Sequence, residues 1–103
     1  MRKDDQDFLD LLIKIDKNPK SSQRKLAGEL GFSLGKLNYC IKSLKEKGLI
    51  KINNFRKNPN KSNYFYILTP SGIKEKTTLT INFMKRKMVE YEELKKNLKK
   101  WNV

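Results

Sequence analysis

The stretch SLGKLNYCIKSLKE, residues 33–46, concentrates side chains that can form hydrogen bonds with a polar ligand. Asn can bind adenine through two hydrogen bonds, Lys can donate to guanine or to phosphate, and Ser can bond to either. Tyr adds a hydroxyl group and a flat ring that can contact a thymine methyl group or a sugar. These residue types favour contact with base edges and the phosphate backbone, and the candidates are Ser33, Lys36, Asn38, Tyr39, Lys42 and Ser43.

The apolar residues of the same stretch predict a helix that presents this polar face. Leu37, Ile41 and Leu44 recur at spacings of four and three, with Cys40 beside them. Turning these residues to a core leaves Lys36, Tyr39, Lys42, Ser43 and Glu46 outward, with Asn38 and Ser33 at the rim and the N-terminus. A solvated polar surface is the simpler alternative. Two features favour DNA: a cation in the first turn, where the helix dipole favours anions, and a chain without acidic residues between Glu46 and Glu75.

The overall composition restricts the classes of partner. Lys and Arg number 24 against 11 Asp and Glu, and this excess favours a polyanion such as nucleic acid. The 103 residues support one domain with a modest core. No apolar run approaches the length of a membrane span, and the first residues lack the apolar segment of a signal peptide. We therefore expect no membrane segment and a cytoplasmic location.

Residues for catalysis or metal binding are scarce. The chain has no His, and the single Cys40 can neither form an internal disulfide nor supply a zinc cluster. No Gly-rich loop ending in Lys-Ser or Lys-Thr is present. We expect no enzymatic activity, no metal and no cofactor. Cys40 should pack inward as a small apolar residue rather than act as a redox sensor.

Two further helices are predicted before the polar stretch. The first follows Asp4, Asp5 and Asp7, has an apolar face from Phe8 to Ile15, and ends before Asn18-Pro19. The second begins after Ser22 as N-cap, turns Leu26, Ala27 and Leu30 inward, and stops at Gly31. Ser33 then caps the third helix, and Gly48 ends it. Ala27 is small where the second and third helices meet, and Gly31 permits the left-handed backbone of a sharp turn.

Two strands are predicted after the third helix, in LIKINNF and NYFYILT. We expect Phe65 and Ile67 to point inward, with the tyrosines flanking them. The segment RKNPNKS between the strands is rich in turn residues and forms a basic hairpin tip that carries Arg56, Lys57 and Lys61.

A long helix is predicted after Thr69 as N-cap and Pro70 at the first helical position, ending near Trp101. Gly72 and three threonines make a bend possible near its start. Packing against the first helix accounts for part of Ile73 to Phe83, but a helix of roughly 45 Å is longer than a small domain needs. We expect a symmetric dimer, with either crossing direction, whose interface is formed by Phe83, Met84, Met88, Tyr91, Leu94, Leu98 and Trp101.

Three helices followed by a hairpin are the order of a winged helix-turn-helix domain. The stretches SLGKLNYCIKSLKEKGLIKINNFR, LTPSGIKEK and FMKRKMVEYE resemble the MarR family, most closely its small members associated with exopolysaccharide genes. The resemblance covers about Gln23 to Leu94. It implies a dimeric transcription regulator, mainly α with a small β-hairpin, divided into a DNA-binding part at 1–69 and a dimerisation helix at 70–103. Its recognition helix would enter the major groove of double-stranded DNA, with the wing along the backbone or in the minor groove, and repression is the family tendency.

Other functions stay open at this point. The same charge would serve a winged domain that binds DNA or RNA without sequence preference, and the Tyr64-Phe65-Tyr66 cluster could offer a stacking surface. The long helix could instead be the working part of a protein-interaction module. The target genes, the operator and any small-molecule effector are not specified by these residues. Many MarR relatives have a longer dimerisation region with ligand pockets, whereas a single C-terminal helix is expected here.

Overall fold

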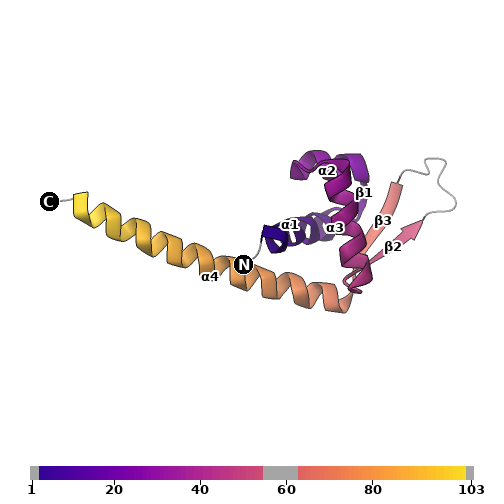
Figure 1. Ribbon diagram of the computed structural model, residues 1–103. Helices are drawn as coiled ribbons and strands as arrows, with labels where there is room; N and C mark the ends of the chain where they lie inside the picture. Colours follow the sequence, from indigo (N-terminus) through magenta and orange to yellow (C-terminus); the bar gives the residue numbers. More distant parts are fainter. Residues whose placement is uncertain (1–2, 55–62, 102–103) are drawn as a thin grey trace.

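The computed structural model describes residues 3–54 and 63–101 of the chain (Figure 1). Four helices and three short strands follow one another in the order α1, β1, α2, α3, β2, β3, α4. Their bounds are Lys3–Lys17 for α1, Lys20–Ser22 for β1, Gln23–Leu30 for α2, Leu34–Glu46 for α3, Ile50–Asn54 for β2, Asn63–Leu68 for β3 and Pro70–Trp101 for α4. The predicted helices are confirmed, and β1 was not predicted.

The helix-turn-helix segment is formed by local capping interactions. The Ser22 hydroxyl accepts a hydrogen bond from the backbone N–H of Lys25 at 3.1 Å, and Ser33 does the same for Lys36 at 3.1 Å. Each cap satisfies a backbone donor that the first helical turn would leave unpaired. Gly31 ends α2 with φ of 70°, a left-handed conformation that glycine adopts without a steric penalty. The turn from α2 to α3 is therefore tight and fixed.

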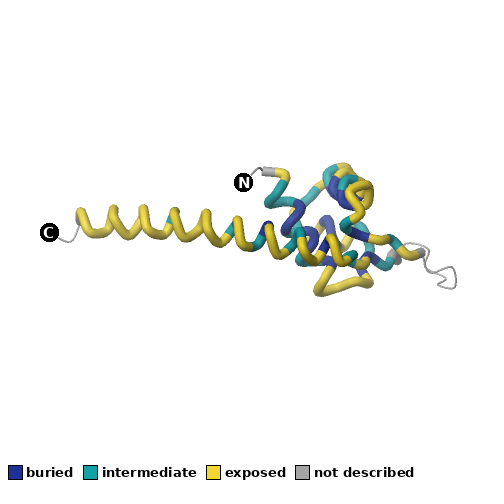
Figure 2. Tube along the Cα trace, turned by 90° about the horizontal axis from the view of Figure 1, so that it is seen from below, coloured by how far each residue is buried: buried dark blue, intermediate teal, exposed yellow. Residues whose placement is uncertain are grey.

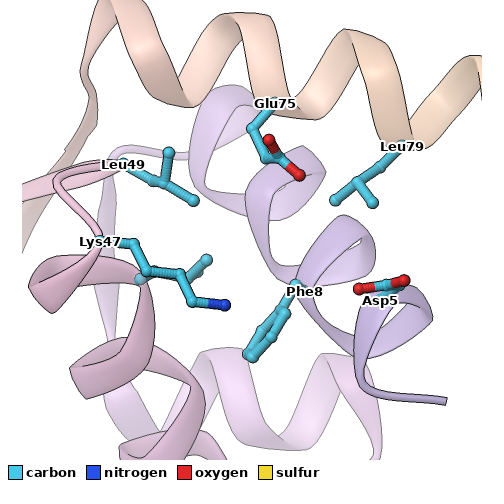
Figure 3. A pocket seen from close by; sticks show the side chains of 7 residues that line it. Asp5, Phe8, Lys47, Leu49, Glu75 and Leu79 are labelled. Carbon is cyan, nitrogen blue, oxygen red and sulfur yellow. The ribbon is translucent and has the colours of Figure 1, made fainter. Parts of the chain in front are cut away.

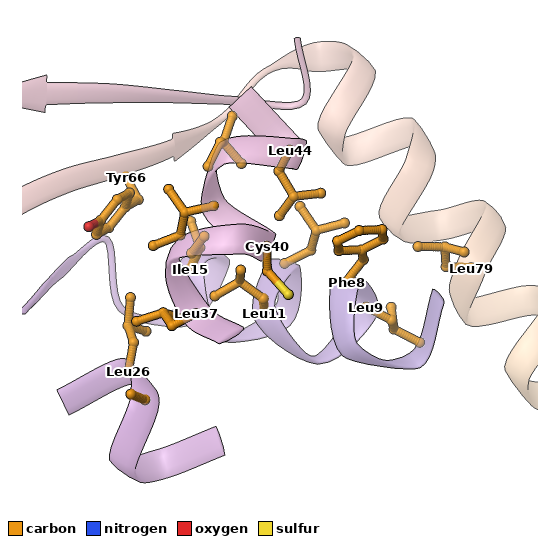
Figure 4. Close-up of a cluster of buried hydrophobic side chains, with 14 residues drawn as sticks. Phe8, Leu9, Leu11, Ile15, Leu26, Leu37, Cys40, Leu44, Tyr66 and Leu79 are labelled. Atoms are coloured by element: carbon orange, nitrogen blue, oxygen red, sulfur yellow. The ribbon is translucent and has the colours of Figure 1, made fainter. Parts of the chain in front are cut away.

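The core lies where α1, α2, α3 and the sheet meet (Figure 4). Leu11, Leu12, Leu26 and Leu37 have no exposed surface, and Leu44 is 1% exposed. Burial of each such side chain contributes about 1.5–3 kcal/mol of transfer free energy. The helices that carry the candidate site are thus held by a continuous apolar cluster.

The sheet has three antiparallel strands in the order β1-β3-β2. Ile50 pairs with Leu68 and Ile52 with Tyr66, and this register puts these four residues on the face toward the helices. Tyr66 is 1% exposed, whereas Ile67 is 41% exposed. The expectation that Phe65 and Ile67 point inward was therefore wrong, because the opposite face of β3 covers the core. The short β1 pairs with the other edge of β3, so the predicted two-stranded hairpin is part of a three-stranded sheet.

The start of α4 is fastened to the turn between α3 and β2. Thr69 caps the helix, since its hydroxyl accepts from the Gly72 N–H at 3.0 Å and donates to the Gly48 carbonyl at 2.6 Å. A Cβ atom at Gly72 would lie 2.0 Å from the Leu49 carbonyl oxygen, so only glycine permits this close approach. The predicted N-cap is confirmed, and Gly72 allows the start of α4 to pack closely against the backbone of Leu49.

Two different environments follow along the 32 residues of α4. Its first half packs against α1, with Leu79 buried and Phe83 half-buried at the edge of the core. Beyond Phe83 the helix extends away from the other elements, and nearly all of it is exposed (Figure 2). The molecule is consequently elongated, with extents of 67 × 26 × 21 Å.

Candidate nucleic-acid interface

The outer face of α3 is the most complete candidate site. Leu37, Cys40, Ile41 and Leu44 anchor the inner face of this helix in the core. The residues that alternate with them are turned outward by the helical period. Asn38, Tyr39 and Lys42 are all exposed, and Tyr39 retains 57% of its surface. An amide, a phenol and an ammonium group are thus presented together on a rigid helix, as the sequence predicts.

The other flank of α3 faces α1 and is less available. The Lys36 ammonium lies 3.1 Å from the Asp7 carboxylate and 4.3 Å from the centre of the Phe32 ring. Its charge is therefore balanced within the protein, and a contact with phosphate requires this ion pair to open. Ser43 is half-buried on the same flank, while Ser33 is exposed but uses its hydroxyl to cap the helix.

The basic hairpin tip cannot be compared with the structure. Arg56, Lys57 and Lys61 lie outside the described residues, so their predicted contact with DNA stays a prediction. The strands that lead to the tip are described, and Lys51 on β2 is exposed. Lys20 on β1 lies 5.4 Å from the centre of the Phe65 ring. Basic residues therefore occur on both edge strands of the sheet.

Some exposed basic residues on α2 and α3 were not predicted as part of the site. Arg24 and Lys25 lie in the first turn of α2, and Lys45 lies near the end of α3. The sequence contained the signal for the first two, because turning Leu26, Ala27 and Leu30 inward leaves them outward. A helix N-terminus with basic side chains suits a DNA phosphate.

A cavity of about 370 Å³ lies between α1, α4 and the end of α3 (Figure 3). Its lining combines apolar groups with three charged ones, and consists of Asp5, Phe8, Leu44, Lys47, Leu49, Glu75 and Leu79. The Lys47 ammonium lies 4.8 Å from the centre of the Phe8 ring. The cavity therefore brings two carboxylates and one ammonium group to a largely apolar lining.

Neither metal ligands nor a membrane segment were found in the described part of the chain. No group of three or more His, Cys, Asp or Glu residues in it is arranged to hold a metal ion. No helix among the same residues is both long enough and apolar enough to cross a bilayer.

Cys40 lies in the core with 2% of its surface exposed, so its predicted inward position is confirmed. Burial raises the pKa of its thiol above the ordinary value of 9.0, and the charge of Asp7 adds to this effect. A thiol with a raised pKa holds little reactive thiolate at neutral pH.

The residues predicted for a dimer interface fall into two groups. Phe83 packs at the edge of the chain's own core, whereas Met84, Met88, Tyr91, Leu94 and Leu98 are 57–65% exposed. The side chain of Trp101 lies outside the described residues. An apolar stripe is thus present on the distal half of α4 and is not covered by residues 3–54 or 63–101, which the structure describes.

Comparisons with known proteins agree with this architecture. The model of the winged helix-turn-helix DNA-binding family matches residues 9–51, from α1 into β2. A search of curated protein sequences finds no significant match.

Several solved structures are similar in fold. The PcaV transcriptional regulator from Streptomyces coelicolor, in complex with its natural ligand, aligns with 84% of this chain at 15% identity and a TM-score of 0.73. MarR from Staphylococcus aureus, in complex with salicylate and kanamycin, aligns with 84% at 18% identity and a TM-score of 0.67. The transcriptional repressor CouR, bound to a 23-mer DNA duplex, aligns with 84% at 20% identity and a TM-score of 0.69.

This chain spans 60%, 57% and 59% of the length of these three proteins. The chain is therefore a winged helix-turn-helix protein with the fold of MarR-type transcription regulators.

Proposed function

We propose that this protein is a sequence-specific regulator of transcription that binds double-stranded DNA as a symmetric dimer. The observation that carries the proposal is the exposed set Asn38, Tyr39 and Lys42 on α3, which the core holds in place through the opposite face of the helix. The chain's net charge of +13 supplies the sequence-independent attraction to phosphate.

The N-terminal half of α3 is the part that we propose to read bases. Ser33, Asn38 and Tyr39 lie there, and no acidic residue occurs in α3 before Glu46 at its end. Glu46 is exposed and would repel phosphate if the C-terminal end entered the groove. In helix-turn-helix proteins the N-terminal residues of the second helix contact base edges. Arg24 and Lys25 at the start of α2 and the basic hairpin tip would then contact the backbone.

Dimerisation explains both the long helix and the requirements of a DNA site. Two recognition helices read adjacent major grooves when they lie about 34–36 Å apart. A two-fold dimer reads a two-fold operator. CouR, which is similar in fold, is bound to a 23-mer DNA duplex, and this supports DNA binding by the fold. Repression, control of exopolysaccharide genes and a cytoplasmic location are parts of the proposal that rest on the family resemblance.

Selection of duplexes from a random pool, followed by affinity measurements on the selected site and on random DNA, tests the proposal. Asn38→Ala and Tyr39→Ala should each cost about 1–3 kcal/mol on the selected site and much less on random DNA. Lys57→Ala should weaken both about equally and lower the salt slope by about one. Asn82→Ala, an exposed Asn on α4, is the matched control and should change neither.

Equal losses on both duplexes for Asn38→Ala and Tyr39→Ala would refute base reading and indicate a non-specific nucleic-acid-binding protein. A full-length monomer that binds a palindromic site tightly would refute the dimer. Tighter binding of single-stranded RNA than of the selected duplex would favour the RNA-binding alternative.

A further inference from the structure

The distal half of α4 carries a shallow apolar groove of about 290 Å³ that the chain leaves open. Five residues line it, namely Phe83, Met84, Lys87, Met88 and Tyr91. The stripe continues beyond the groove through Leu94 and Leu98, which are 64% and 65% exposed. Contiguous exposed apolar residues on a helix mark a contact surface for another helix.

The spacing along the stripe fits a second copy of the same helix. Met84, Tyr91 and Leu98 are separated by seven residues each, which is the repeat of a two-helix seam. Leu94 fills the intermediate position between Tyr91 and Leu98. Lys87 occupies the equivalent position between Met84 and Tyr91, so one layer of the seam contains a cation.

We propose that two copies of α4 pair antiparallel, with the two-fold axis at the level of Val89. This inference rests on the proposed dimer and specifies its geometry. Around that axis Met84 lies opposite Leu94 of the partner subunit, and Leu98 lies opposite the partner's Thr80. Lys87 then lies opposite the partner's Tyr91, so the seam positions from Met84 to Leu94 meet one another, and Thr80 lies seven residues before Lys87.

The position of Lys87 favours this direction. A parallel pair in register would place the two Lys87 ammonium groups against each other in the seam, where like charges are destabilising. In the antiparallel pair each Lys87 lies against the ring of the partner's Tyr91, a cation–π arrangement. Lys87 already lies 5.4 Å from the centre of the Phe83 ring, and its ammonium is 3.2 Å from the Glu90 carboxylate. The counter-charge therefore comes from the same helix.

The distribution of charge along α4 favours the same direction. Residues 85–87 carry three cations, residues 90–93 carry three carboxylates, and residues 95–100 carry four lysines, whereas residues 77–84 carry no charge. A parallel pair in register would place each charged block beside the same block of the partner, so that like charges face each other. The antiparallel pair brings residues 85–87 level with the carboxylates of the partner and brings each lysine-rich end level with an uncharged segment.

The acidic start of α1 adds to this complementarity. Asp5, in the first turn of α1, lines the same cavity as Leu79 of α4 (Figure 3). In the antiparallel pair, Lys99 of the partner subunit is level with Leu79. The lysine-rich end of one copy is thus placed on the side of the acidic start of α1 of the other, and opposite charges attract where they come within about 8 Å at physiological salt.

Crosslinking between variants that each carry one added cysteine besides the buried Cys40 distinguishes the parallel from the antiparallel pair. The variants Met84→Cys, Leu94→Cys and Leu98→Cys are treated separately with a short bis-maleimide reagent, and the first two are also mixed and re-equilibrated before treatment. The unmodified protein is the control, because its buried Cys40 should give no product. Light scattering on each sample reports the mass, which should be twice the 12.2 kDa of one chain.

We expect crosslinked dimer only in the mixture of Met84→Cys with Leu94→Cys. In the antiparallel pair the two copies of Leu98→Cys are roughly 27 Å apart along the helices, too far for a short reagent. If a seam variant lowers the mass to that of a monomer, the flanking pair Ile81→Cys and Lys95→Cys replaces it and should likewise react only when mixed.

Crosslinking of Leu94→Cys or Leu98→Cys with itself in a sample of dimer mass would overturn the antiparallel geometry and leave the dimer standing. A monomer mass for the unmodified protein would overturn both. The affinity losses expected for Asn38→Ala and Tyr39→Ala do not depend on this result, so base reading by α3 is tested separately.

Discussion

The two halves of α4 have similar apolar content but opposite environments. In the first half, Leu79 is 6% exposed and packs on α1, and Lys76 reaches Asp16 of α1 at 2.7 Å. In the second half, Leu94 and Leu98 are about two-thirds exposed. The ion pairs there, Arg86 and Lys87 with Glu90, stay within the helix. An apolar stripe in the sequence therefore does not reveal which of its residues the chain itself buries, because only the packing of α1 against the first half of α4 decides this.

Removal of the distal half of α4 should have the largest effect, which we expect on the oligomeric mass and on the affinity for DNA. It tests whether the two halves of α4 have separate roles. A chain that ends after Lys87 keeps every buried residue of the core, so its unfolding in denaturant should stay cooperative. We expect a monomer by light scattering. Its affinity for a two-fold operator should fall about 10²–10⁴-fold, because the second half-site is no longer bound within one molecule.

A truncated chain that remains a dimer would show that the second half of α4 is not the interface. A truncated chain that fails to unfold cooperatively would show that the two halves are not independent.

Two leucine substitutions should have smaller effects, and each should change a different quantity. A substitution in the core should lower the stability of the monomer, whereas one on the distal half of α4 should weaken the dimer. Leu37→Ala in the core removes a fully buried side chain and should lower the free energy of unfolding by about 2–5 kcal/mol. Leu94→Ala removes an exposed side chain, so the stability of dilute monomer should change by less than about 0.5 kcal/mol while dimer dissociation becomes easier. Chemical denaturation at several protein concentrations separates the two.

If both substitutions lowered the free energy of unfolding by the same amount at every protein concentration, Leu94 would not be part of a dimer interface.

The smallest effect is expected for the thiol of Cys40. Because burial raises its pKa, the native thiol should react with a maleimide much more slowly than the thiol of the unfolded chain at pH 8. A raised pKa in the folded state also contributes stability that is present below the unfolded pKa near 9.0 and is lost as pH rises through the folded value. Labelling rates in buffer and in denaturant measure the first effect.

Fast labelling of the native protein accompanied by loss of DNA binding would instead identify Cys40 as a redox-sensitive residue.

Local sequence signals predicted most of the fold correctly because they act over a few residues. Ser22, Gly31, Ser33 and Thr69 mark helix ends through interactions with their own neighbours, and all four function as predicted. Leu37, Ile41 and Leu44 similarly fix which face of α3 is buried. Once that face is buried, the helical period alone places Asn38 and Tyr39 on the exposed side of α3.

Errors arose where pairing between distant segments decides the outcome. The residues of β1 have no strand pattern, and they form a strand because they pair with β3, where the Tyr66 N–H donates to the Pro19 carbonyl at 3.1 Å. In β3 the alternation of NYFYIL fixes the period but leaves the inward face open, since both faces carry large apolar groups. The pairing of β3 with Ile50 and Ile52 of β2 decides that Tyr66 is on the inward face.

The helix-turn-helix and the polar face of α3 follow from the sequence alone, because helical period, caps and charge are local or additive properties. The apolar stripe along α4 can also be read from the sequence, and the partner that it predicts stays a prediction. Only the tertiary structure decided that Lys36 is paired with Asp7, 29 positions earlier in the chain, and that Gly72 lies against the Leu49 carbonyl. It also decided where self-coverage of α4 ends, near Phe83. Each of these depends on the distance between segments that only the packed core brings together.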